Sequence, residues 1–409
     1  MKTDRRNILL PLIGIMLGTA IAAMAQKDSP HIGYVYPAGG QQGTTFEVIV
    51  GGKHLDGATS ALVTGGGIQT EVVDYIRPLN QGQFKEMQNR MGELKKKKRA
   101  AAPEGDSRRG RHRGRRRSKP ALSEGGTPEA EEDLMKIKQR LATFAIRRYS
   151  APALVETVTL RVTVAPDAEP GERELRLLTG SGLSNPLVFQ VGQLPEATER
   201  SGRSIAVEAS RRRGGRGRKR QADSRPPPGT SPMNDEPEQE TDISLPVLLN
   251  GQILPGDVDR YRFRAQRGQQ LIVHVSARRL IPYLSDAVPG WFQATVALSD
   301  TDGREVAYND DFLFHPDPAL RFDVPADGEY VLEIRDALYR GREDFVYRVT
   351  VGELPFITGV FPLGTQTGTP AELEVRGWNL SVASLKLAPL APGVHPVSLR
   401  TARGLTNSV

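Results

Sequence analysis

The 409-residue sequence contains no cysteine, which excludes disulfide bonds, thiol catalysis and cysteine-ligated zinc. Its six histidines are scattered, and none is spaced as a pair of metal ligands or lies beside a nucleophile-elbow pattern. Beyond the amino-terminal stretch, no apolar run is long enough to cross a bilayer. Stability must therefore come from sheet cores or bound ions, and the sequence predicts a protein that is not an enzyme.

The amino-terminal segment has the pattern of a signal peptide. Three basic side chains within the first six residues precede an apolar stretch at 8–23, and Ala23-Met24-Ala25 is a small-residue cleavage pattern. We expect residues 1–25 to be removed and the mature chain to have no integral membrane span. The alternative is an uncleaved anchor, for which a stretch interrupted by Pro11 is short.

Glycine and proline are abundant, with 42 and 30 residues, and the apolar fraction is 38%. Such a balance favours many short strands joined by turns over packed helices. Segments such as 158–164 alternate apolar and polar residues with period two, as half-buried strands do. At this length several domains are expected, and the fold class predicted is all-β, with tandem sandwiches.

The net charge of +7 is concentrated in two tracts, 95–120 and 200–220, and the rest of the chain is acidic. Neither tract can form a hydrophobic core, so both are predicted to be disordered, solvated linkers. They contain no aromatic residue that could stack on nucleic-acid bases. We expect at most weak, salt-sensitive binding of polyanions.

An internal repeat is the most informative feature. The 26 residues "PHIGYVYPAGGQQGTTFEVIVGGKHL" from Pro30 align without a gap with "PFITGVFPLGTQTGTPAELEVRGWNL" from Pro355, and "PGERELRLLTGSGLSNPL" from Pro170 aligns with "PGVHPVSLRTARGLTNSV" from Pro392. The chain thus carries two copies of one module. The second copy stops before a closing strand equivalent to "VFQVGQLPE", which predicts an unpaired sheet edge and a chain that ends within a module.

The first copy is interrupted by two stretches with helical spacing, one including Phe84, Met87, Met91 and Leu94 and the other running from Leu134 to Phe144. They predict a helical hairpin inserted into the module; the alternative is one docked helix and one disordered stretch. The expected organisation is a signal peptide at 1–25, an immunoglobulin-like sandwich at 26–196 with a helical insertion at 78–150, a linker at 197–240, a jelly-roll-like sandwich at 241–353 and an incomplete second module at 354–409.

The block at 241–353 contains about seven short alternating strands, and its segments "GDVDRYRF", "NDD" and "PADGEY" resemble the bacterial pre-peptidase C-terminal domain. The resemblance implies a jelly-roll-like sandwich of the kind attached to secreted bacterial proteases and surface proteins. The repeated module resembles TIG-type immunoglobulin-like domains through "GTTFEVIVGG" and "GLSNPLVFQV". A secreted, periplasmic or cell-surface location in a bacterium is implied.

Clusters of oxygen-bearing side chains are the only candidate site. They lie in "GDVD", "SDTDG" and "NDD", and loops of this kind gather hard oxygen ligands around calcium. The resemblance adds to this, because related sandwich domains of bacterial collagenases bind calcium. The alternative is that these residues only form turns. The candidate calcium ligands are Asp257, Asp259, Asp300, Asp302, Asn309, Asp310 and Asp311.

These observations favour a non-catalytic binding or spacer protein at the cell exterior, whose partner is an unidentified protein or polysaccharide. The rival hypothesis is an amino-terminal accessory part of a secreted hydrolase, most simply a protease, whose catalytic domain lies beyond residue 409. Fold analogy does not distinguish the two, because one sandwich fold serves many functions.

Overall fold

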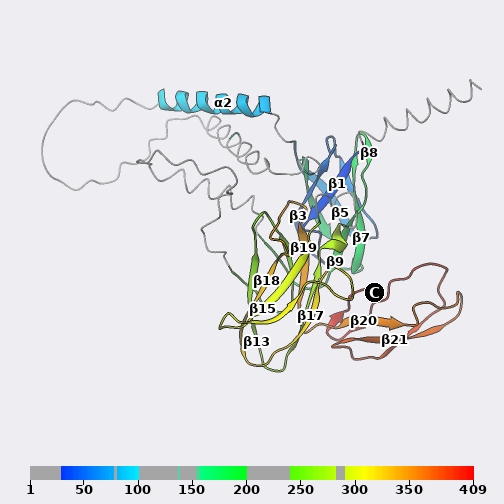
Figure 1. Ribbon diagram of the computed structural model, residues 1–409. Helices are drawn as coiled ribbons and strands as arrows, with labels where there is room; N and C mark the ends of the chain where they lie inside the picture. The colour runs from blue at the N-terminus through cyan, green and yellow to red at the C-terminus, as the bar shows by residue number, and fades with distance from the viewer. Residues whose placement is uncertain are drawn as a thin grey trace, which may run out of the picture. The chain divides into compact units, whose positions relative to one another are not determined.

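A computed structural model describes residues 29–77, 81–100, 137, 154, 156–199, 240–281 and 291–409. These residues form several β-sheets in sandwich-like domains, together with the helix α2 (Gln81–Ala100), so the all-β prediction is confirmed (Figure 1). The signal peptide, the basic tract beyond residue 100, the linker beyond residue 199 and the second predicted helix apart from Ile137 lie outside the described residues. Among the described helices, none has the length and apolarity needed to span a membrane.

The chain divides into two compact units, one with all the named strands and one that includes α2. Helix α2 confirms the first helical prediction. Its predicted apolar positions, Phe84, Met87, Met91 and Leu94, are half-buried, while the residues between them are mostly exposed. The apolar stripe is therefore the less exposed side of an otherwise polar helix.

The first sandwich contains two sheets. One has the order β1-β3-β6-β5, and the other has the order β2-β9-β7-β4, with β8 beside β7. Strands β5 and β6 pair with each other although residues 77–155 separate them, so that segment leaves and re-enters the sandwich at neighbouring strands. The strands are β1 (His31–Tyr36), β2 (Gly39–Gln41), β3 (Thr45–Lys53), β4 (Ser60–Val63), β5 (Ile68–Ile76), β6 (Glu156–Val164), β7 (Gly171–Thr179), β8 (Gly182–Leu183) and β9 (Leu187–Gly192).

The second sandwich has sheet orders β10-β12-β19-β14-β17 and β11-β13-β18-β15-β16. Alternation places Tyr261 and Phe263 of β13 in the core, and Arg262 and Arg264 on the outer face. The strands are β10 (Glu196–Thr198), β11 (Thr241–Asp242), β12 (Val247–Gln252), β13 (Asp259–Ala265), β14 (Gln270–Ser276), β15 (Ala294–Ser299), β16 (Glu305–Asn309), β17 (Ala319–Asp323), β18 (Gly328–Asp336) and β19 (Val346–Gly352).

One sheet of the second sandwich is covered on both faces. Val346 of β19 and Leu280 of the short helix η2 (Arg278–Leu280) belong to the core of the first sandwich. Ile272 of β14 packs instead against Phe356 of the last module. The sequence pattern suggests half-buried strands here, whereas β19 is buried at nearly every position because neighbouring modules cover the outer face.

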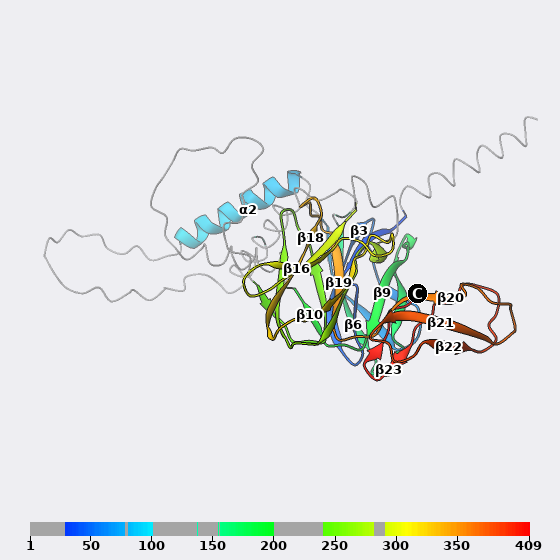
Figure 2. The same cartoon turned by 60° about the horizontal axis from the view of Figure 1, so that its bottom comes forward.

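The last module contains the sheet β20-β21-β22 and the pair β23-β24 (Figure 2). Its strands are β20 (Phe356–Phe361), β21 (Ala371–Trp378), β22 (Ser384–Leu387), β23 (Arg400–Thr401) and β24 (Gly404–Leu405). The sequence repeat is also a structural repeat. The β1–β3 ladder shifts register between Ile32 and Tyr34, and the β20–β21 ladder shifts at the equivalent Ile357 and Gly359.

The two copies also share their side-chain hydrogen bonds. The Asn185 side chain accepts from the Ile32 amide at 2.8 Å and donates to the Ile32 carbonyl at 2.9 Å. Asn407 makes the same two bonds to Ile357 at 2.6 and 2.9 Å. In each copy, the Asn side chain thus joins the first strand to the segment just before the position of the closing strand. This shared role explains why the Asn recurs in both copies.

Candidate functional site

The first two sandwiches follow each other directly in the chain. The chain leaves β9 of the first sandwich, and within four residues β10 pairs in parallel with β12 of the second. Arg348 of β19 reaches across β12 to β10 in the same sheet. Its guanidinium donates to Glu196 of β10 at 2.7 Å and to Asn250 of β12 at 2.7 Å, and all three side chains are largely buried.

Gly39 of the first sandwich lies directly against this guanidinium. A Cβ at position 39 would lie 2.1 Å from the Gln190 carbonyl oxygen and 2.8 Å from Cζ of Arg348, so glycine is required by close approach. An ion pair between Arg279 of η2 and Glu172 of β7, at 2.6 Å, crosses the junction. The two sandwiches are therefore joined by chain continuity, packing and charge.

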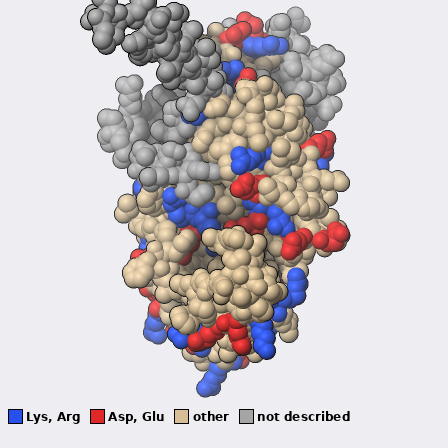
Figure 3. Space-filling model, turned by 90° about the vertical axis from the view of Figure 1, so that its right-hand side faces the viewer, with Lys and Arg blue, Asp and Glu red and all other residues tan. Residues whose placement is uncertain are grey.

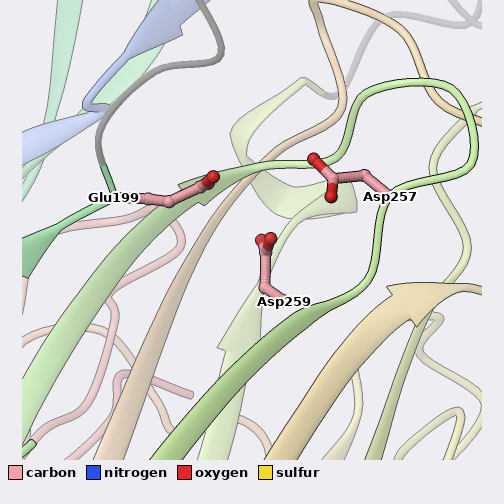
Figure 4. Close-up of side chains that lie close together, drawn as sticks. All are labelled: Glu199, Asp257 and Asp259. Carbon is pink, nitrogen blue, oxygen red and sulfur yellow. The ribbon is translucent and has the colours of Figure 1, made fainter. Parts of the chain in front are cut away.

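Three carboxylates converge beside the junction. Glu199 follows β10, Asp257 lies in the β12–β13 loop and Asp259 begins β13. One carboxylate oxygen from each lies within 4.8 Å of the others, and all three groups face a common space (Figure 4). All three residues lie in segments of the second sandwich, close to the point where the chain enters it from the first.

Hydrogen bonds fix each member of this cluster. The Glu199 carbonyl accepts from the Tyr36 hydroxyl at 2.9 Å, and the Glu199 carboxylate accepts from the Gln252 amide at 3.2 Å. Asp257 accepts from the amide of Val258 at 3.1 Å. Strands β1 and β12 therefore hold Glu199 in place, and the β12–β13 loop holds Asp257.

Asp259 is held by two buried tyrosines. The Tyr347 hydroxyl donates to Asp259, and the Tyr261 and Tyr347 hydroxyls are 2.7 Å apart. Burial, followed by the charge of Asp259, raises the pKa of both tyrosines well above the ordinary value, so they remain protonated donors. Because Tyr347 donates its proton to Asp259, Tyr261 donates to Tyr347.

The electrostatics of the cluster favour a positive occupant. Burial, reinforced by the charge of Asp257, raises the pKa of Glu199 to about 7. Burial and then the neighbouring carboxylates raise the pKa of Asp259 well above its usual range, and burial raises that of Asp257. Three acids this close either retain protons or share a cation. An all-oxygen donor set of this kind suits a hard divalent ion.

The structure brings together two of the seven predicted ligands, Asp257 and Asp259. It adds a third carboxylate from Glu199, a residue of the predicted linker at 197–240. Asp300 caps the β15–β16 turn, where it accepts from the amides of Asp302 and Arg304 at 2.9 and 3.0 Å. Asn309 accepts from the next two amides and donates to the Ala319 carbonyl at 2.7 Å. Asp302, Asp310 and Asp311 lie exposed in these two loops, and among the described residues only Glu199, Asp257 and Asp259 form a metal-sized group.

A second feature is an exposed apolar surface on three loops of the second sandwich. The Gln293 side chain donates to the Asp310 carbonyl at 2.9 Å, and the Gln293 carbonyl accepts from the Ala337 amide at 2.9 Å, so these loops are neighbours. The loop surface, as we call it, consists of Trp291, Leu313, Phe314, Leu338 and Tyr339, all exposed. On the face shown in Figure 3, acidic and basic side chains are interspersed.

Comparison with known protein families finds no match. A probable subtilase-type serine protease of Deinococcus radiodurans is 35% identical over 80 residues, which cover 20% of this chain and 10% of that protein. The chain thus spans about a tenth of the length of this curated relative.

Two solved structures show low overall similarity. The pre-peptidase C-terminal domain of a Bacillus anthracis collagenase is 18% identical, covering 29% of this chain and 99% of that one with a TM-score of 0.21. A periplasmic inhibitor of g-type lysozyme from Aeromonas hydrophila is 16% identical, covering 28% of this chain and 98% of that one with a TM-score of 0.20.

Proposed function

We propose that this chain is a non-catalytic modular protein of the cell exterior, in which calcium bound by Glu199, Asp257 and Asp259 fixes the junction between the first two sandwiches. The observation that carries the proposal is the convergence of three carboxylates, two half-buried and one buried, within 4.8 Å, where the backbone of Glu199 also bonds to Tyr36 of the first sandwich. Of the seven calcium ligands predicted from the sequence, the proposal keeps Asp257 and Asp259, and it adds Glu199.

The physical argument concerns the cost of three adjacent negative charges. Without a cation, burial and mutual repulsion favour the protonated acids, as the raised pKa values of Glu199 and Asp259 indicate. Calcium accepts six to eight oxygen ligands in irregular geometry, so a group of three carboxylates suits it better than magnesium, which requires octahedral geometry. Binding would link Glu199 to the β12–β13 loop and stabilise the folded state.

Calcium titration of the full chain tests this proposal, with the thermal midpoint followed against a chelator control. At calcium concentrations a hundredfold above the dissociation constant, binding adds about 2.7 kcal/mol to the free energy of unfolding. We expect the rise in the thermal midpoint to be lost in E199Q and in D259N. The matched control is D302N, which removes an exposed predicted ligand outside the cluster. A calcium response that survives in both cluster variants would refute the site.

The loop surface is the part of the molecule that we propose for partner binding. Leu313, Phe314 and Tyr339 adopt positive φ values of 49°, 66° and 54°, which are unfavourable for bulky side chains. Exposed apolar groups in one patch are typical of a contact site for a protein or polysaccharide. Affinity electrophoresis in soluble polysaccharides and affinity capture from cell-envelope extracts should show binding that weakens in F314S/Y339S; equal binding by both proteins would assign the contact elsewhere.

The second candidate is an accessory part of a secreted protease. It is favoured by the 80-residue similarity to a probable subtilase-type serine protease. The genomic reading frame downstream of the Val409 codon tests it. A frame that continues into a domain with Ser, His and Asp of a hydrolase supports this candidate, and a stop codon contradicts it.

A further inference from the structure

The β16–β17 loop contains a tight turn with two exposed apolar side chains. Phe312 and His315 exchange two backbone hydrogen bonds, at 2.8 and 2.9 Å. The two residues between them, Leu313 and Phe314, have positive φ values of 49° and 66°. A two-residue turn of this kind usually contains Asn-Gly, because positive φ is unfavourable for bulky side chains. Leu313 is 65% exposed and Phe314 is fully exposed, so the turn carries a local cost while both apolar side chains face solvent.

The loop after β18 forms a second apolar tip. The fully buried carboxylate of Asp336 accepts from the amides of Leu338 and Arg340 at 3.0 and 3.1 Å, and from the Arg340 guanidinium at 3.0 Å. Leu338 and Tyr339 lie on this support and are 70% and 57% exposed. Arg340 also donates to the Trp291 carbonyl at 2.9 Å, which joins the third loop to the second. Hydrogen bonds therefore fix the positions of these exposed side chains.

The shape of the loop surface limits what can bind it. The side chains of Leu313, Phe314 and Leu338 are 65% exposed or more, so they protrude from the surface and do not line a groove. A sugar ring stacks on an aromatic face and gains little from a protruding leucine. A protein partner needs a pocket of matching shape. A lipid bilayer needs none, because its fluid acyl region surrounds an apolar side chain of any shape.

The residues beside the protruding side chains suit the headgroup layer of a membrane. Trp and Tyr gather at membrane–water interfaces, and Arg is attracted to lipid phosphate groups. The guanidinium of Arg278 lies 5.0 Å from the centre of the Trp291 ring. That of Arg335 lies 4.5 Å from the centre of the Tyr339 ring. Both exposed rings thus have a cation beside them, as expected at the boundary between acyl chains and headgroups.

We propose that the loop surface inserts into a phospholipid bilayer and attaches the second sandwich to it. The three protruding side chains enter the acyl region, while Trp291 and Tyr339 lie at headgroup level. Asp310 and Asp311 are exposed in the same loop as the tight turn and offset the arginines, so apolar contact supplies most of the binding. This inference goes beyond the contact with a protein or polysaccharide proposed above, and it does not depend on the calcium site.

Trp291 provides the readout, because the chain contains two tryptophans and W378F leaves only this one. Trp378 packs against Phe312 and Phe356, where Phe is a conservative replacement. The W378F chain is mixed with phosphatidylcholine vesicles, with and without bromine-labelled acyl chains, at about 0.5 M salt, which screens binding by the basic tracts. We expect sedimentation with the vesicles, Trp291 emission at shorter wavelength, and quenching of that emission by bromine.

Two variants in the W378F chain test which side chains insert. F314S/L338S removes two protruding side chains, so vesicle partitioning should fall about tenfold or more. The matched control is L62S, because Leu62 is 51% exposed but belongs to β4 of the first sandwich, and its partitioning should be unchanged. An equal fall in both variants, or no fall in F314S/L338S, overturns the proposal.

Absence of both sedimentation and an emission shift also overturns it. Capture of a protein or polysaccharide that F314S/Y339S weakens would then assign the loop surface to that partner. The proposed function would stand in that case, so failure of lipid binding is distinguishable from failure of the function proposed above.

Discussion

Arg348 and Glu196 form an ion pair of 2.7 Å within one sheet of the second sandwich, beside the junction with the first, and their side chains are 1% and 12% exposed. Asn250 completes the arrangement, because its amide donates to Glu196 at 2.8 Å while its carbonyl accepts from Arg348. Each of these buried charges compensates the other, so removal of either one would leave the remaining charge buried without compensation. The pair therefore fixes the position of β10 on the second sandwich.

Replacing Arg348 by Met tests this dependence. Met preserves most of the side-chain volume but leaves the Glu196 carboxylate buried with only Asn250 as its partner. Loss of one partner of a buried pair costs about 3–5 kcal/mol, so a fall of that size in the free energy of unfolding is expected in urea titration. The control is Arg264→Met on the same sandwich, whose side chain is 86% exposed and lies 3.0 Å from Glu329. That change should cost less than about 1 kcal/mol, and equal losses in the two variants would contradict the role of the buried pair.

The acidic cluster predicts a pH dependence of stability when calcium is removed. The pKa of Glu199 rises from an ordinary value of 4.5 to about 7, so between these values the folded chain retains a proton that the unfolded chain has lost. The contribution of Glu199 to stability therefore falls as pH increases from 4.5 to 7. In chelator, we expect the thermal midpoint of E199Q minus that of the unmodified chain to increase over this range. Calcium should abolish the increase, and a constant difference in chelator would rule out the raised pKa.

The contribution of His274 to stability changes with pH in the direction opposite to that of Glu199, so the two effects are measured separately. Burial, followed by the charges of Arg279 and His315, lowers the pKa of His274 to about 4 from 6.5. Acid therefore favours the unfolded chain, and the contribution of His274 to stability is lost as pH falls from 6.5 to 4. The ring of His274 lies 5.1 Å from that of Phe356 of the last module. We expect H274F to reduce the acid sensitivity of the thermal midpoint in this range and to leave the calcium response intact; unchanged acid sensitivity would contradict this assignment.

The repeated asparagine predicts a specific loss in each copy. Asn185→Ala removes both side-chain hydrogen bonds to fully buried Ile32, and an unsatisfied buried group costs about 1–3 kcal/mol. Faster hydrogen exchange at the Ile32 amide and a lower thermal midpoint are the expected results. Gln193→Ala, which removes an exposed 3.2 Å contact with Gln42, should change stability by less than about 0.5 kcal/mol. Asn407→Ala should accelerate exchange at Ile357 instead, and exchange that stays slow in both variants would contradict the shared role.

Much of this fold could be predicted from alternation and repetition, because each sandwich strand has one face in its own core. Alternation could not predict that the outer faces of β14 and β19 are also buried, since this depends on which module packs on those faces. Arg348 illustrates this limit of alternation. Its position in an alternating strand predicts an outward, solvated side chain, yet a neighbouring sandwich buries it.

The acidic cluster was only partly predictable for the same reason. The segment "GDVD" indicates Asp257 and Asp259, whereas the basic tract beside Glu199 favours a linker at that position. A signal was present in the repeated segments "VGQLP" at 191–195 and "VGELP" at 351–355, which each join one module to the next. The second leads directly into β20, so the first indicates that residues after Pro195 begin the next module and carry Glu199 to it.

The basic tracts at 95–120 and 200–220 yield a prediction that depends on charge alone. A dense run of Lys and Arg binds polyanions by releasing their counterions, so affinity should fall steeply as salt increases. On a heparin column at low ionic strength, the full chain should be retained and should elute at moderate salt. A variant with the Lys and Arg of both tracts changed to Gln keeps the linker lengths, and it should pass through unretained because the rest of the chain is acidic. Elution of both proteins at the same salt concentration would assign the binding to the folded modules instead.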